Sequence, residues 1–253
     1  MITLRDITHR LGPDLLSAAA LLTRLPLPDH QGTGAASAWA WPLIGALIGA
    51  LAALGASIAL ALGLTAGVVA ALTLALIALL TGALHEDGLS DSADGLFGGW
   101  TRERRLEIMK DSRIGSYGML ALMLVTLARW SALTTILAHD AQWVALIAAG
   151  ALSRAPMAVI MALLPNARSS GLSHGTGRPT VAVVAVGCGS AVAIALILTG
   201  GAVLGMLALT IAATAALAVS AQRRIGGQTG DILGAAQQLG DAACLAALAA
   251  ALS

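Results

Sequence analysis

Seven long apolar runs limit the folds that are open to this chain of 253 residues. A helix needs roughly 20 mostly apolar residues to cross the hydrocarbon core of a bilayer, and each run is about that long. Hydrophobic residues make up 58% of the sequence and charged residues 11%, against about 45–50% and about 25% in soluble domains. We therefore predict an all-α, polytopic integral membrane bundle that forms a single domain over residues 1–253. The predicted spans are residues 41–61, 64–84, 117–138, 142–164, 180–199, 202–221 and 232–252.

The residues before the first run predict a helix at the membrane surface. The apolar stretch Leu15–Leu22 is too short to span a bilayer, and Arg24, Pro26 and Pro28 follow it closely. It also lacks a convincing small-residue site for cleavage of a signal peptide. We expect an interfacial or re-entrant helix here. Glycines recur in the first span, at Gly45, Gly49 and Gly55, and such small residues predict close packing between helices.

The basic residues predict how the spans are oriented. If residues 85–116 are cytoplasmic, 12 of the 14 Lys and Arg residues lie in cytoplasmic segments and the external loops contain none. The remaining two, Arg129 and Arg154, lie within spans. This bias follows the positive-inside rule and predicts an internal N-terminus and an external C-terminus. We expect an integral protein of the bacterial cytoplasmic (inner) membrane, in contact with the lipid bilayer.

The overall charge excludes one class of partner. The 14 Lys and Arg and the 13 Asp and Glu residues leave a net charge of +1, so the chain has no broad basic face for nucleic acid. Cys188 and Cys244 lie far apart in apolar runs, which favours two buried thiols over a disulfide or a metal pair. The sequence is compatible with a homo-oligomer and does not determine the oligomeric state.

Charge concentrates between His85 and Ser116, where 12 of the 27 charged residues (14 basic and 13 acidic) lie. Asp87, Asp91 and Asp94 are spaced i, i+4 and i+7, so on a helix they fall within roughly 60° of one another. Three carboxylates on one stripe repel, and aspartate is a poor residue for a helix interior. Because no basic residue lies between them, we interpret the stripe as a site for a hard cation such as Mg²⁺.

The second half of the segment adds groups that bind phosphate. Residues 102–107 have the pattern of a solvated surface with Arg–Glu pairs. The following Lys110–Arg113 supplies a cation, a fourth carboxylate, a hydroxyl group and a forked guanidinium. The residues by themselves thus predict a membrane enzyme that uses Mg²⁺ to transfer a phosphoryl-linked group at the cytoplasmic surface.

Two long motifs begin in the charged segment, HEDGLSDSADGLFGG at 85–99 and RRLEIMKDSRIGSYG at 104–118. Three further motifs lie elsewhere in the chain: LLTRLPLP at 21–28, WPLIGALIG at 41–49 and RRIGGQTGDILGA at 223–235. In their order along the chain, they closely resemble the motifs of the cobalamin synthase family, the adenosylcobinamide-GDP ribazoletransferases.

This resemblance implies a late step in the assembly of the cobalamin nucleotide loop. Adenosylcobinamide-GDP and α-ribazole, or its 5′-phosphate, would give adenosylcobalamin, or its 5′-phosphate, and GMP, with Mg²⁺ as the metal. A ribose hydroxyl would attack the phosphorus next to cobinamide, and GMP would leave.

The resemblance also implies roles for individual residues. The implied metal ligands are Asp87, Asp91, Asp94 and Asp111. The implied catalytic residues are Asp94, Asp111 and His85, and which aspartate is the general base stays open. The implied substrate contacts are Lys110, Arg113, Arg24, Thr229 and Asp231. Asp231 could equally serve as an N-cap or first-turn acid of the last span.

Three charged residues lie within the predicted spans. Arg129 and Arg154 are each about halfway along a span, where an unpaired charge is costly. Asp241 is the one carboxylate in the middle of a span, so we expect a structural Arg–Asp contact. In the loop 169–178, His174 fits either a flap over the substrate or a mobile solvated loop.

Two other functions compete with this interpretation. A transporter or channel would place its essential carboxylates at mid-membrane near broken helices, whereas the main acidic cluster here lies at the end of a span. A lipid-type CDP-alcohol phosphotransferase would use the same chemistry on a different acceptor. Only the extended motifs separate it from the ribazoletransferases.

Overall fold

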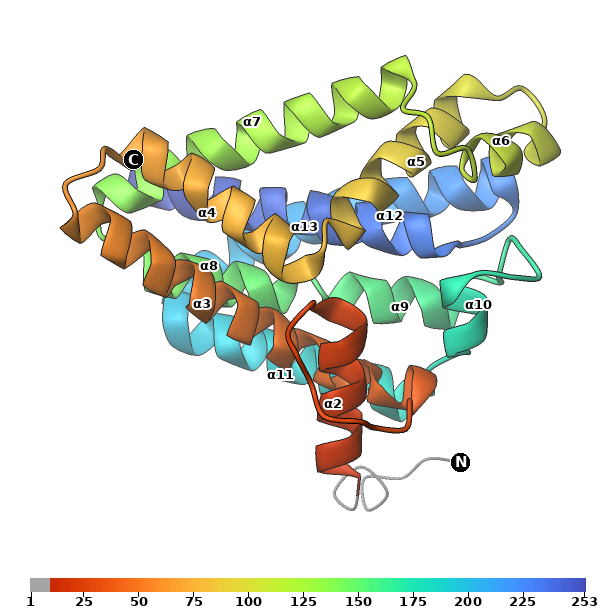
Figure 1. Cartoon of the computed structure of the whole chain (residues 1–253), viewed down its shortest axis with the longest axis horizontal. Helices are drawn as coiled ribbons and strands as arrows, with labels where there is room; N and C mark the ends of the chain where they lie inside the picture. Colours follow the sequence, from red (N-terminus) through yellow and green to blue (C-terminus); the bar gives the residue numbers. More distant parts are fainter. Residues whose placement is uncertain (1–9) are drawn as a thin grey trace.

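The computed structural model describes residues 10–253, and every regular element in this part of the chain is a helix (Figure 1). The first nine residues of the predicted domain lie outside the described part. The helices are α2 (Leu11–Leu22), η1 (Gly34–Ala40), α3 (Trp41–Ala61), α4 (Ala66–Thr81), α5 (Leu84–Gly98), α6 (Arg102–Ile108), α7 (Ser116–Ala138), α8 (Gln142–Leu152), α9 (Ala155–Leu163), α10 (Leu172–Thr176), α11 (Val181–Thr199), η2 (Gly200–Ala202), α12 (Val203–Ile225) and α13 (Gly230–Leu252).

Several of these helices are long and apolar enough to cross a membrane, which confirms the polytopic helical bundle. Among the described residues, five stretches qualify, or six when the bent pair α4–α5 is counted as one span. One stretch, Val181–Ile225, has 45 residues, about twice what a bilayer requires. It consists of α11 and α12, which meet at Gly200, where φ is +54°. The total of seven spans stays a prediction. The structure would contain seven if α11 and α12 each cross the membrane and the shorter α4 forms a further span.

The chain bends sharply between α4 and α5. The predicted span 64–84 ends early, at Thr81, because Gly82 and Ala83 both adopt the left-handed region, with φ of +66° and +55°. The two helix axes then differ by 92° (Figure 1). We treat α5 as lying outside the spanning segments, since it leaves the direction of α4 and carries four carboxylates.

The predicted span 142–164 is also interrupted. It divides into α8 and α9 at Ser153 and Arg154. Pro156, in the first turn of α9, has no backbone N–H to donate to the carbonyl of Leu152, so one helix cannot continue through this point. The Arg154 side chain instead donates to the Gly150 carbonyl at 3.0 Å and to Ser153 Oγ at 3.1 Å.

A buried ion pair joins α7 to α13. Arg129 Nε donates to Asp241 Oδ2 at 2.9 Å, and Arg129 Nη1 donates to Gln238 Oε1 at 2.7 Å. Glu86 of α5 lies 3.6 Å from the same guanidinium. This confirms the expected Arg–Asp contact for Arg129 and gives the two mid-helix charges a structural role.

The N-terminal helix α2 is short and runs across the direction of the long helices (Figure 1). It is attached to η1, just before the first span, by a hydrogen bond in which Trp39 Nε1 donates to the buried Asp14 Oδ2 at 3.0 Å. The predicted separate N-terminal helix is therefore present, and its last residues, Leu21 and Leu22, border the cavity described below.

Candidate active site

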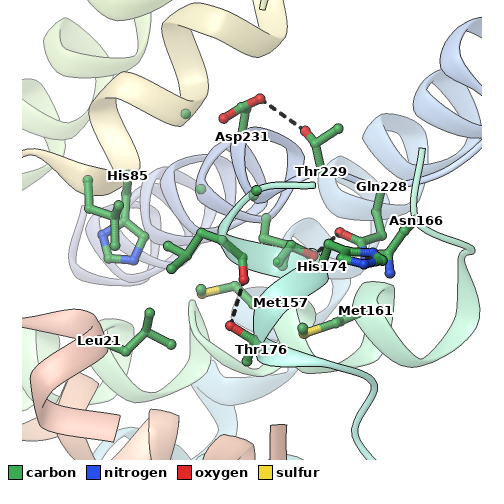
Figure 2. Close-up of a pocket in the computed structure, with 18 of the residues that line it drawn as sticks. Leu21, His85, Met157, Met161, Asn166, His174, Thr176, Gln228, Thr229 and Asp231 are labelled. Carbon is green, nitrogen blue, oxygen red and sulfur yellow. Dashed lines mark hydrogen bonds between the residues drawn. The ribbon is translucent and has the colours of Figure 1, made fainter. Parts of the chain in front are cut away.

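A cavity of about 200 Å³ lies where the first turns of α5 and α13 face α9 and α10 (Figure 2). One side of it is polar and the other is apolar. The polar side is formed by Asp87, Arg168, Ser173, His174, Thr229 and Asp231. The apolar side is formed by Leu21, Trp41, Leu84, Met157, Met161 and Leu233, with His85 between the two sides. The cavity thus combines residues that are far apart in the sequence.

Backbone pairing between two loops builds the polar side. Ala167 N–H donates to the Gln228 carbonyl, and Gln228 N–H donates to the Pro165 carbonyl, both at 2.8 Å. Ser173 Oγ of α10 donates to Gln228 Oε1 at 2.6 Å, so α10 is fixed above the start of α13. Gly227 is required in this arrangement because an added Cβ would overlap the Pro165 carbonyl oxygen.

The first turn of α13 holds two of the predicted substrate contacts. Thr229 is the N-cap residue, and its Oγ1 accepts a hydrogen bond from Ile232 N at 3.3 Å. The same hydroxyl donates to Asp231 Oδ2 at 3.1 Å (Figure 2). Arg168 Nη1 lies 3.2 Å from that carboxylate. Asp231 is therefore a first-turn acid, as considered from the sequence, and its carboxylate also borders the cavity.

The aspartate stripe lies on a helix, as its spacing predicts, because α5 includes all three residues. Asp87 is exposed and borders the cavity, and Asp91 follows one turn later. Burial, together with the negative charges of Asp87, Asp231 and Asp94, raises the pKa of Asp91 to about 7, against the opposing charge of Arg168. The carboxylates of α5 and α13 thus form one electronegative cluster.

The third aspartate of the stripe is oriented towards a different helix. Asp94 is 7% exposed and accepts hydrogen bonds from Gly115 N at 2.7 Å and Gly118 N at 2.9 Å. These N–H groups belong to the start of α7, where a negative charge is favourable. A Cβ at Gly118 would lie only 3.0 Å from the Asp94 carboxyl carbon, which explains the glycine at this position. Asp94 therefore fixes α5 to α7.

Asp111 and Arg113 pair with each other in the structure. Arg113 Nη2 donates to Asp111 Oδ2 at 2.7 Å; the Arg113 side chain is exposed, and the Asp111 side chain is partly exposed. These hydrogen bonds lower the pKa of Asp111 to about 2. Neither residue borders the 200 Å³ cavity, and the exposed Arg24 packs against Gly82 at the bend between α4 and α5. The functional assignments of these three residues stay predictions.

A second, more open cavity of about 570 Å³ adjoins the first and is lined by basic side chains. The predicted phosphate contact Lys110 lies here, together with Arg102 and Arg168. Asn166, Arg168, Ser170 and His174 border both cavities. A cationic surface of this kind, next to a carboxylate cluster, suits a diphosphate.

The carboxylates fit a hard cation that is also bound by substrate. Within residues 10–253, no three His, Cys, Asp or Glu side chains converge into a ready metal site. Mg²⁺ commonly uses only one or two protein carboxylates and completes its coordination with water and substrate phosphate. Asp87 and the neighbouring Asp91 meet that requirement, because both are oxygen donors in the electronegative cluster.

Sequence reasoning missed several residues of this site. Arg168 has two roles, as the partner of Asp231 and as a wall of both cavities, yet it lies in a loop without a recognisable motif. Trp41, Met157 and Met161 looked like ordinary residues of apolar spans. Trp41 begins the family-like motif at 41–49, but its contact with the cavity, like that of the two methionines, is known only from the structure.

Comparison with known proteins agrees with the motifs. The sequence model for cobalamin-5-phosphate synthase matches residues 14–249. A protein of Bradyrhizobium diazoefficiens named adenosylcobinamide-GDP ribazoletransferase is 47% identical over 243 residues, which covers 94% of this chain and 93% of the relative. A protein of the same name from Mesorhizobium japonicum is 44% identical over 95% of this chain and 94% of its own length.

A third relative with that name, from Sinorhizobium medicae, is 42% identical over 94% of this chain and 97% of its own length. No solved structure matches the chain. The family match covers the described spans, except the last three residues of α13, and every residue that borders the cavity. The chain therefore belongs to the cobalamin-5-phosphate synthase family.

Proposed function

We propose that this protein is an adenosylcobinamide-GDP ribazoletransferase, the activity for which its relatives are named. It would join adenosylcobinamide-GDP to α-ribazole or its 5′-phosphate and release GMP. The observation that carries the proposal is the contact between two cavities, one bordered by Asp87 and Asp231 and the other by Lys110 and Arg102, with Arg168 between them. Phosphoryl transfer needs this combination of carboxylates and phosphate-binding cations.

In this proposal the two cavities bind different parts of the substrates. The diphosphate of adenosylcobinamide-GDP binds along the basic cavity, held by Lys110 and Arg168. A ribose hydroxyl of α-ribazole lies against the carboxylates, and one of the pair Asp87 and Asp231 accepts its proton. The hydroxyl oxygen forms a bond to the phosphorus next to cobinamide, and the bond from that phosphorus to the GMP oxygen breaks. Asp87 and Asp91 would hold Mg²⁺, which neutralises negative charge on the diphosphate.

The remaining residues implied by the family motifs support this arrangement. Asp94 orients the stripe through its hydrogen bonds to the start of α7. In our proposal Lys110 and Arg113, with Asp111 between them, contact the diphosphate from the solvent side. His85 lies two residues before Asp87 on α5 and also borders the first cavity.

An assay with defined substrates tests the function. Purified protein in liposomes is incubated with adenosylcobinamide-GDP, α-ribazole 5′-phosphate and Mg²⁺, and the release of GMP and the formation of adenosylcobalamin 5′-phosphate are followed. The proposal requires both products in equal amounts. Release of GMP without the joined product, or turnover with a lipid alcohol in place of ribazole, would contradict it.

Turnover should depend on Mg²⁺. Excess EDTA should abolish product formation, and added Mg²⁺ or Mn²⁺ should restore it, because the Asp87 and Asp91 carboxylates and the substrate diphosphate repel each other without a hard cation. The measurement is the initial rate before and after chelation. Undiminished turnover in excess chelator would contradict the metal assignment.

We further propose that the active site faces the cytoplasm of the inner membrane. The basic residues of the segment 85–116 support this orientation through the positive-inside rule. A reporter that is active only in the cytoplasm should therefore be active after residue 100 and inactive after Ser253. The predicted spans after residue 100 are odd in number, so the two positions should lie on opposite sides of the membrane. Reporter activity at both positions would contradict this topology.

A further inference from the structure

The apolar half of the first cavity has a composition that suits a flat, uncharged ring system. Met157 and Met161 are spaced i, i+4 on α9 and present their side chains to the cavity from the same face (Figure 2). Methionine side chains are polarisable and pack well against aromatic rings. Leu21 of α2 and Leu84 of α5 border the same space. At about 200 Å³, it is smaller than the roughly 300–1,000 Å³ of pockets that enclose a whole ligand, so it suits one ring system.

Two buried nitrogen atoms of residues that border the cavity have no hydrogen-bond partner among the described residues 10–253. They are Trp41 Nε1 and His85 Nε2, and both residues are 1% exposed and border the cavity. Leaving a buried donor without a partner is costly, and the indole N–H of Trp41 can only donate. A ligand that fills the space should therefore bring an acceptor atom.

We propose that this cavity binds the benzimidazole base of ribazole, with Trp41 Nε1 donating a hydrogen bond to the free ring nitrogen. This inference rests on the proposed function and names the part of the substrate that enters the cavity. In a benzimidazole riboside one ring nitrogen carries the sugar, and the other remains an acceptor in an otherwise apolar bicycle. Guanine and the adenine of the adenosyl group, the other bases among the substrates, carry exocyclic polar groups that the leucine and methionine side chains would leave unpaired.

The position of the cavity agrees with the transfer step. Asp87 lies two residues after His85 on α5, and it borders the polar side of the same space together with Asp231 and Arg168. A base held at Trp41 and the methionines would place its attached ribose beside these carboxylates. A 5′-phosphate on that ribose would then lie near Arg168 and His174, at the border with the basic cavity.

The test combines one variant with one altered ligand. Trp41→Phe removes the N–H group and keeps an aromatic ring, and a riboside with indole in place of benzimidazole replaces the acceptor nitrogen by C–H. Binding of α-ribazole and of the indole riboside is measured by calorimetry with wild type and variant in detergent. Wild type should bind α-ribazole about five- to tenfold more tightly than the indole riboside, as expected for one hydrogen bond. Trp41→Phe should bind both with the same, weaker affinity.

Trp130→Phe is the matched control, because the Trp130 indole N–H donates to the Gly67 carbonyl between α4 and α7, away from this cavity. It should keep the wild-type preference. Equal binding of the two ribosides by wild type would overturn the proposal, and this comparison needs no variant to fold. A preference that survives in Trp41→Phe would also overturn it. Because binding is measured without adenosylcobinamide-GDP, an inactive protein that still prefers α-ribazole would contradict the proposed function and leave this inference standing.

Discussion

Asp87→Asn should lower single-turnover formation of the joined product by on the order of a hundredfold or more, the usual effect of losing a key electrostatic group. Asparagine keeps the size and most of the hydrogen bonding of aspartate but removes the charge. Asp87 is the one residue of the aspartate stripe that borders the cavity, and it shares that cavity with Asp231. The measurement uses the liposome assay at saturating Mg²⁺, after insertion and folding of the variant have been checked.

Two glutamates provide matched controls for this loss. Glu103→Gln and Glu107→Gln remove the same charge from the same segment, but Glu107 forms an exposed pair with Arg104 at 3.1 Å, and Glu103 is exposed. Exposed pairs contribute at most about 1 kcal/mol, so both variants should keep near-normal rates. If either control were as inactive as Asp87→Asn, or if Asp87→Asn stayed active, the proposal that the aspartate stripe holds the metal would be wrong.

Asp94→Asn and Asp111→Asn complete the series, and the sequence predicts a comparable loss for both. The structure adds a physical difference between them. The Asp94 oxygens accept from Gly115 N and Gly118 N, so an amide NH₂ group at that position would face a donor and loosen the start of α7. Asp94→Asn should therefore lose activity and thermal stability together, whereas Asp111→Asn should lose activity alone.

Gly49→Ala should prevent most of the protein from reaching its folded state. The helices α3 and α8 approach so closely here that a Cβ at position 49 would overlap the Leu146 carbonyl oxygen. It would also lie 2.6 Å from the Leu146 carbonyl carbon and 2.9 Å from Ile147 N. All three atoms belong to the backbone, so no flexible side chain can move away. Overpacking costs about 1–3 kcal/mol or more. The yield of monodisperse protein in mild detergent and its melting temperature measure the effect.

Gly189→Ala is the matched control for this prediction. Gly189 lies within the apolar helix α11, and its added Cβ would meet no atom within 4 Å among the described residues. Alanine has the higher helix propensity, by about 1 kcal/mol, so this variant should fold at least as well as wild type. Equal yields and melting temperatures for Gly49→Ala and wild type would mean that α3 and α8 do not pack as the structure describes.

The sequence by itself determined the helical bundle, because a bilayer imposes a length and a composition on every segment that crosses it. It also identified the aspartate stripe on α5, since the spacing of Asp87, Asp91 and Asp94 follows the period of a helix. The pairing of Arg129 with Asp241 could be predicted as well, because a charge inside a membrane requires a partner and the sequence offered few.

The tertiary structure alone decided how these elements meet. The bend at Gly82 and Ala83 directs α5 against α13, so that Asp87 and Asp231 share a cavity although 144 positions separate them (231 − 87). The same packing joins Trp41 to the two methionines of α9 and places Arg168 between the cavities. The periodicity of a sequence predicts which face of a helix a residue occupies. Which other helix packs against that face depends on the backbone geometry of the turns and on close contacts between helices.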